Sequence, residues 1–287
     1  MDHGVFNEFF NCAFSVGTCF VLSVLYVASF YVWNSQHNRN HPSTIKKRFF
    51  SVFVMMFVSP IFLNIALNEN IKEKALLWEV MGLRTPCIIP ATILPLVLTM
   101  VLFLGPISMQ ANSGILKLHS QPVFWLNNLR DLIWWRNHVV APLSEEFTFR
   151  ACMLPALLQC FQPITAVFIC PLFFGVAHFH HMAERINSGL DLKTALIISC
   201  FQFFYTTLFG AYSAYLFART GHMMAPFIAH AFCNHMGFPD FTELRAYQGI
   251  KRTFIASLFV LGLVLWCLLL NPLTDPRWYA NELFWKV

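Results

Sequence analysis

Long apolar runs separated by short polar stretches make up most of the chain, and this pattern predicts a bundle of membrane helices. A transmembrane helix needs about 20 predominantly apolar residues, and its backbone groups must be hydrogen-bonded within the segment. The expected fold is therefore an all-α polytopic integral membrane protein with about eight transmembrane helices. The apolar runs lie at residues 9–33, 49–67, 86–109, 132–160, 162–179, 194–217, 222–237 and 253–271.

The stretch between the third and fourth apolar runs is amphipathic and ends at Arg136. Because it carries Trp125, Leu126 and Leu129 among polar residues, we expect part of it to lie in the membrane interface. The sequence contains no internal repeat and no low-complexity tract. We therefore expect residues 1–287 to form a single integral membrane domain.

The composition supports a membrane protein and excludes several other classes. Hydrophobic residues make up 57% of the chain and charged residues only 11%, whereas soluble domains carry about 25% charged residues. The 32 Phe and 8 Trp suit a lipid-facing surface with aromatic belts. The net charge of +5 suits anionic lipid headgroups but is not dense enough to indicate nucleic-acid binding.

The nine cysteines are scattered, mostly in apolar segments, and no C-x-x-C pair occurs. We expect them to be reduced, packed thiols and not a disulfide framework or a zinc site. Basic residues concentrate on one side of the predicted topology. With eight crossings, the odd-numbered loops hold twelve Lys and Arg and the even-numbered loops six. The positive-inside rule then places the odd-numbered loops in the cytosol.

The stretch APLSEEFTFRACMLPALL places charge inside the fourth apolar run. Intramembrane charge is costly and indicates function by default. Glu146 and Arg150 have i,i+4 spacing in the order that favours an ion pair. Glu145 points about 100° away on a helix and is left as the candidate base. Alternatively, Ser144 starts a helix at the interface and the two carboxylates favour its dipole.

Two further helices carry polar side chains at a spacing of four residues. Phe174 and His178 share one helical face, and so do His230 and Asn234. A carboxylate and an imidazole together can orient and deprotonate a water. A second histidine and an asparagine amide can donate hydrogen bonds to a developing oxyanion. If these helices converge, the group suits amide hydrolysis by activated water without a covalent intermediate.

Other protease designs are missing from the sequence. There is no H-E-x-x-H zinc helix and no G-x-S-x-G elbow. An intramembrane aspartyl pair is also missing, because every Asp lies outside the apolar runs: Asp2, Asp131, Asp191, Asp240 and Asp275.

A metal site remains an alternative. Glu145, His178 and His230 form a possible His₂Glu zinc set, with Asn234 outside the ligand shell. His178, His180 and His181 form a second possible set, although a solvated interfacial role fits the last two better. We expect activity without a metal or other cofactor.

The order E-E-x-x-x-R (Glu145–Arg150), F-x-x-x-H (Phe174–His178) and H-x-x-x-N (His230–Asn234) resembles the type II CAAX prenyl endopeptidase family, particularly its eukaryotic members. Each motif alone is weak, but their ordered combination on membrane segments is specific. The match covers about residues 142–239, so residues 140–240 are expected to form the catalytic core.

The resemblance implies an endoplasmic-reticulum protease that removes the last three residues of prenylated C-a-a-X proteins, such as Ras-like GTPases, from the cytosolic side. It implies Glu145 and His178 as the water-activating pair and His230 and Asn234 as the oxyanion site. Glu146 and Arg150 would be structural or would orient the substrate, with Arg150 near its carboxylate. The sequence does not indicate an oligomeric state.

Two other functional classes remain open. A non-catalytic membrane scaffold of the same fold would bind without cleaving, although all six polar positions of the motifs are present. A transporter would use Glu146 and Arg150 as a gate, which flux measurements in liposomes would detect.

Overall fold

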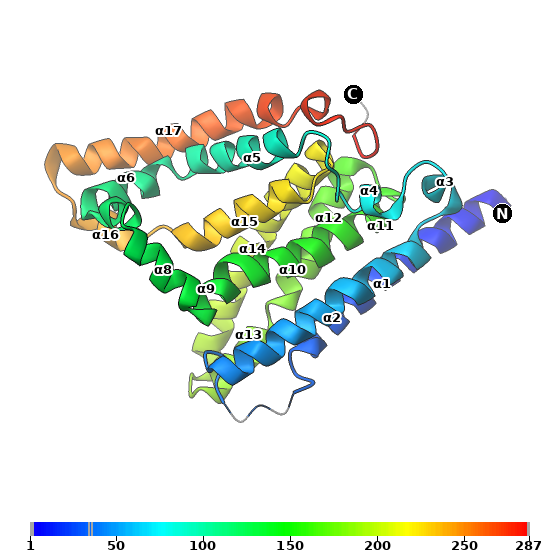
Figure 1. The fold of residues 1–287 in the computed structure, drawn as a ribbon, viewed down its shortest axis with the longest axis horizontal. Helices are drawn as coiled ribbons and strands as arrows, with labels where there is room; N and C mark the ends of the chain where they lie inside the picture. The colour runs from blue at the N-terminus through cyan, green and yellow to red at the C-terminus, as the bar shows by residue number, and fades with distance from the viewer. Residues whose placement is uncertain (1–2, 34, 36, 286–287) are drawn as a thin grey trace.

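The computed structural model describes residues 3–33, 35 and 37–285, and every regular element in this part of the chain is helical (Figure 1). The all-α expectation is therefore confirmed. Asp2 and Lys286, which entered the counts of charged residues, lie outside the described residues.

The membrane-spanning helices number five or six within the described residues, and not eight as expected. The possible sixth crossing consists of α5 (Ile88–Leu102) and α6 (Leu104–Ser113), which are bent by 75°. The other five crossings are α1 (His3–Ser29), α2 (Pro42–Ala66), α12 with α13 (Pro163–Ala177 and His180–Asn187), α14 (Leu192–Thr220) and α17 (Gly249–Leu273).

Two expected crossings are instead interior segments of the bundle. The run at 222–237 forms α15 (Met224–Met236), whose 13 residues extend only about 20 Å, less than a hydrocarbon core of about 30 Å. The run at 132–160 is divided into α9 (Leu132–Trp135), η1 (Arg136–Val140), α10 (Ala141–Glu145), η2 (Glu146–Met153) and α11 (Leu154–Leu158). The elements η1 and η2 are π-helical, a form that often occurs at functional sites.

The π-helix η2 occupies the centre of the molecule. All eight of its residues are buried, and it contacts α1, α2, α12, α14 and α15. Figure 1 shows α1 beside α2 along one side of the molecule and α5 beside α17 along another, with the central helices between them. The apolar character of η2 is thus explained by protein neighbours and not by lipid, which is why hydropathy overcounted the crossings.

Local sequence signals set both ends of the long helix α14. Asp191 caps α14 by accepting a 2.9 Å hydrogen bond from the backbone N–H of Thr194, and Gly221 ends the helix in a left-handed conformation. The shorter elements are α3 (Glu69–Lys72), α4 (Leu77–Val80), α7 (Ile115–His119), α8 (Pro122–Arg130), α16 (Phe241–Ala246) and the 3₁₀-helix η3 (Pro276–Tyr279).

The stretch expected at the membrane interface forms α7 and α8, which expose Trp125, Leu126 and Leu129. Its interfacial location remains a prediction.

A disulfide joins Cys12 in α1 to Cys160, which follows α11. The expectation of reduced thiols is therefore wrong for this pair, whereas the other seven cysteines are free. The Cα atoms of Cys12 and Cys160 lie 5.3 Å apart, within the usual range for disulfides. Their 148-residue separation hid the pair from the sequence, because only the packing of α1 on α11 brings them together.

Candidate active site

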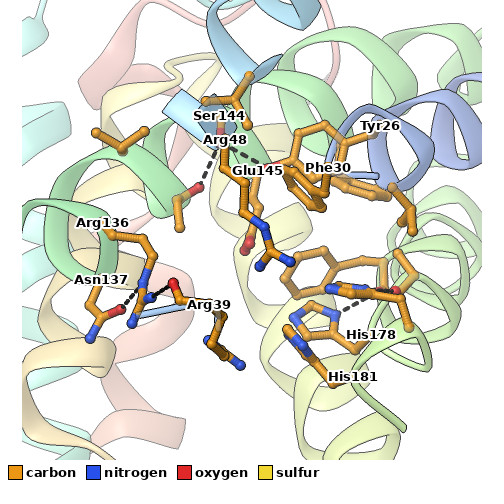
Figure 2. A pocket seen from close by; sticks show the side chains of 18 of the residues that line it. Tyr26, Phe30, Arg39, Arg48, Arg136, Asn137, Ser144, Glu145, His178 and His181 are labelled. Atoms are coloured by element: carbon orange, nitrogen blue, oxygen red, sulfur yellow. Dashed lines mark hydrogen bonds between the residues drawn. The ribbon is translucent and has the colours of Figure 1, made fainter. Parts of the chain in front are cut away.

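A pocket of about 120 Å³ opens beside the central helices, and both Glu145 and His178 line it (Figure 2). Aromatic side chains form much of its wall, including Tyr26, Phe30 and Phe174. The structure therefore brings together, from α10 and the end of α12, the two residues that the sequence assigned to water activation. Apolar atoms make up most of the pocket surface, and charged and imidazole side chains lie among them, an arrangement typical of ligand-binding pockets.

The tautomer of His178 follows from its hydrogen bond. Its Nδ1 lies 2.8 Å from the backbone carbonyl oxygen of Phe174. Because a carbonyl oxygen only accepts hydrogen bonds, Nδ1 carries the proton and donates it. The Nε2 atom then keeps its lone pair and can accept a hydrogen bond or a proton. The rings of Phe174 and His178 also make an edge-on contact, with their centroids 4.6 Å apart, which further holds the imidazole in place.

Glu146 lies behind the pocket in a fully buried polar network. Its Oε1 accepts hydrogen bonds from Arg150 Nη1 at 3.2 Å and from His230 Nδ1 at 2.7 Å. Its Oε2 accepts a 2.5 Å hydrogen bond from the Ser213 hydroxyl. The ion pair predicted from the i,i+4 spacing is thus present, and it is part of a larger network. Three donors compensate the burial of this carboxylate.

Arg150 is also fully buried, and its guanidinium lies 4.3 Å from the centroid of the Phe174 ring. Arg150 is not among the described residues that line the pocket. Its guanidinium therefore holds the interior network together and does not face the space where a substrate would bind.

His230 connects the two glutamates. Its Nδ1 donates to Glu146, and its Nε2 lies 3.7 Å from Glu145 Oε2. The side chain of Glu145 is 18% exposed and has access to the pocket, whereas that of Glu146 is fully buried. The two adjacent carboxylates therefore have different environments, as their helical positions predicted.

Asn234 lies four residues after His230 on α15, and its Nδ2 donates a 2.8 Å hydrogen bond to the backbone carbonyl of Asn137. Asn137 lines the pocket, but neither His230 nor Asn234 is among the described residues that do. Asn234 is thus connected to the pocket wall through Asn137.

Ser144 does not start a helix. It lies within the helical run that continues from α9 into η2, and its hydroxyl is hydrogen-bonded to the Tyr26 hydroxyl at 2.8 Å. The alternative in which Ser144 serves as an N-cap is therefore wrong. Tyr26 and Ser213 were missed in the sequence, because each is an isolated polar residue within an apolar helix and carries no spacing signal.

The arginines of the pocket were also missed as site residues. Arg39, Arg48 and Arg136 line the same pocket as Glu145. In the sequence they were counted only as charges that indicate membrane topology. Their clustering in basic stretches was the available signal, but nothing in the sequence connected these stretches to the helix of Glu145.

The candidate groups of metal ligands differ in whether their donor atoms lie close together. In the described part of the chain, the donor atoms of one group, His180, His181 and Glu184, lie within 4.8 Å of one another. Glu184 Oε1 also accepts a 2.6 Å hydrogen bond from Arg48, whose positive charge opposes a divalent cation. Glu145, His178 and His230 do not bring their donor atoms together in this way, so the zinc set considered from the sequence is not assembled.

Comparisons with known proteins identify the family of this chain. The family model "Type II CAAX prenyl endopeptidase Rce1-like" matches residues 128–236. CAAX prenyl protease 2 of Homo sapiens is 45% identical over 94% of this chain and 84% of its own length. CAAX prenyl protease 2 of Rattus norvegicus is 40% identical over 94% of this chain and 83% of its own length. That of Arabidopsis thaliana is 30% identical over 96% of this chain and 94% of its own length. No solved structure was found to match. Similarity at this level over almost the whole chain confirms the resemblance: the chain belongs to the type II CAAX prenyl endopeptidase family.

Proposed function

We propose that this protein is a membrane endopeptidase that removes the C-terminal tripeptide from prenylated C-a-a-X proteins by direct attack of water. The observation that carries the proposal is that Glu145 and His178 line one pocket in a member of this family. The relatives are named CAAX prenyl protease, which identifies the class of substrate. We further propose that residues 1–287 act as one domain.

In the proposed reaction, a water binds between Glu145 and the Nε2 atom of His178. Glu145 takes one proton from the water, and His178 accepts a hydrogen bond from the other. The water oxygen bonds to the scissile carbonyl carbon, and the carbonyl electron pair moves onto its oxygen. When this intermediate collapses, the carbonyl re-forms, the C–N bond breaks and Glu145 returns its proton to the departing amine.

We assign oxyanion stabilisation to His230 and Asn234. His230 donates a hydrogen bond to Glu146 through Nδ1, and its Nε2 faces Glu145. Nε2 can donate to an oxyanion only when it also carries a proton. The Glu146 carboxylate would stabilise the positive charge of that imidazolium. Asn234 already donates to Asn137, so its amide must leave that carbonyl to reach an oxyanion. Glu146 and Arg150 serve as positioning residues, because both are fully buried and contact His230 or one another.

We place the protein in the endoplasmic reticulum membrane, with the pocket open to the cytosol. Tyr26 near the pocket and Cys12 in the disulfide lie on the same helix, about 21 Å apart at 1.5 Å per residue. This spacing supports a location of the two residues toward opposite faces of the bilayer. A disulfide is favoured on the oxidising luminal face, and the basic residues around the pocket favour the cytosolic face. A prenylated substrate held in the lipid would meet the pocket from that side.

The test is cleavage of a prenylated C-a-a-X peptide by purified protein in detergent. The wild type is expected to release the tripeptide, and Glu145→Ala is expected to abolish release without loss of folding. Glu73→Ala, which removes an exposed carboxylate outside the pocket, is the matched control. Full activity in Glu145→Ala would refute the assignment. Activity is expected to survive exhaustive chelation, and a requirement for one equivalent of zinc would overturn the mechanism.

A further inference from the structure

The wall of the active-site pocket carries more positive than negative charge. Three arginines line it, Arg39, Arg48 and Arg136, whereas Glu145 is the only carboxylate among the described residues that do so. Figure 2 shows the guanidinium groups gathered around the open side of Glu145. The proposed water activation uses Glu145 and His178 and leaves these arginines without a role. A pocket with this charge favours a ligand that carries an anionic group.

The three arginines differ in how many of their guanidinium N–H groups already donate hydrogen bonds within the protein. Arg136 donates through Nη1 to the backbone carbonyl of Arg39 and to Asn40 Oδ1, both at 3.0 Å, and through Nε to Asn137. Arg136 therefore holds in place the segment that carries Arg39. Arg48 donates through Nη2 to Glu184, while its buried Nε has no hydrogen-bond partner among the described residues.

Arg39 is the arginine with the most accessible donors. Its only ion pair in the described structure is a long one, 3.5 Å from Nη1 to Glu184 Oε2, and its side chain is 45% exposed. The pocket wall therefore contains the exposed guanidinium of Arg39, on a segment held in place by Arg136, and also Arg48, whose buried Nε has no partner among the described residues. A planar guanidinium binds a carboxylate or a phosphate through two parallel hydrogen bonds.

A second cavity of about 620 Å³ continues from this wall, and Phe30, Arg39, Arg48 and His181 belong to both cavities. Its other lining residues include Lys47 and Arg185, and Glu184 is its only acidic residue among those described. The two cavities thus form a passage with an excess of positive charge that leads to Glu145. Such a passage would attract an anionic chain end and guide it inward.

The proposed cleavage itself requires a group that recognises the end of the substrate. An enzyme that removes the last three residues must locate the scissile bond relative to the terminus. Three extended residues span about 10 Å, so the terminal carboxylate must lie in or next to the pocket that holds Glu145. We propose that Arg39, assisted by the Nε atom of Arg48, binds the C-terminal carboxylate of the substrate, while Arg136 positions Arg39. This inference rests on the proposed function.

The experiment compares two prenylated peptides that differ only at the terminus, one a free acid and one a C-terminal amide. The ratio of their kcat/KM values is measured for the wild type, Arg39→Gln and Arg39→Lys. Lys46→Gln is the matched control, because Lys46 is an exposed cation of the same region that lines neither cavity.

The wild type is expected to prefer the free acid by about 10-fold to 100-fold, the range that a charge-assisted hydrogen bond provides. Arg39→Gln should reduce this ratio toward one by slowing cleavage of the acid alone, and Arg39→Lys should keep part of it. The control should retain the wild-type ratio.

Equal cleavage of both peptides by the wild type would overturn the proposal. So would an Arg39→Gln protein that keeps the full ratio, or one that loses activity on both peptides equally, as expected if Arg39 bound a lipid phosphate or had only a structural role. Failure of the wild type to cleave either peptide would instead refute the proposed function.

Discussion

Replacing Arg150 by methionine is expected to destabilise the protein strongly, because it leaves the Glu146 carboxylate buried without its guanidinium partner. Both side chains are fully buried, and their closest atoms are 3.2 Å apart. Removing one partner of a buried ion pair typically costs about 3–5 kcal/mol. For a chain of this size, 1 kcal/mol corresponds to about 2–4 °C in Tm, so the expected loss is roughly 10 °C.

The measurement is thermal unfolding of detergent-purified protein at one scan rate. Arg277→Met is the control, because Arg277 makes a shorter ion pair, 2.6 Å to Asp275, but its side chain is 79% exposed. An exposed pair contributes little, so this variant should keep the wild-type Tm. Burial, and not the length of the ion pair, is therefore the variable under test.

The double variant Glu146→Gln with Arg150→Met provides a further check. Removing the charge that Arg150 leaves uncompensated should restore part of the lost Tm, so the two effects should not add. The reasoning fails if Arg150→Met unfolds at the wild-type temperature, or if the double variant loses the sum of the two single effects.

Two further predictions concern packing and the disulfide. Gly210→Ala should destabilise the fold by about 1–3 kcal/mol through overpacking and so lower Tm, because the added Cβ would lie 2.9 Å from a proline carbon and 3.0 Å from a guanidinium nitrogen. Gly17→Ala, with no atom within 4 Å, is its control, and equal Tm values would contradict the prediction. Cys12→Ser should destabilise the fold by about 2–5 kcal/mol, lower Tm and leave Cys160 reactive to a thiol probe, whereas an unchanged Tm would show that the bond does not stabilise the fold.

The sequence determined the features that depend on local chemistry. Hydropathy identified an all-α membrane protein, because a helix satisfies its own backbone groups in any apolar surrounding. The spacing of Glu146 and Arg150 predicted their ion pair, since residues four apart are neighbours on a helix. The ordered motifs around Glu145, His178 and His230 identified the family, which the comparisons confirmed.

The tertiary structure decided how those elements are surrounded. Hydropathy measures removal from water and does not distinguish lipid from protein, so η2 and α15 were counted as crossings although they are interior segments. The Cys12–Cys160 disulfide joins two segments that are distant in sequence. The contacts of His230 with Glu145 and Glu146 likewise join helices that are far apart along the chain. The arginines entered the pocket for the same reason: packing, and not any local pattern, placed their basic segments beside Glu145.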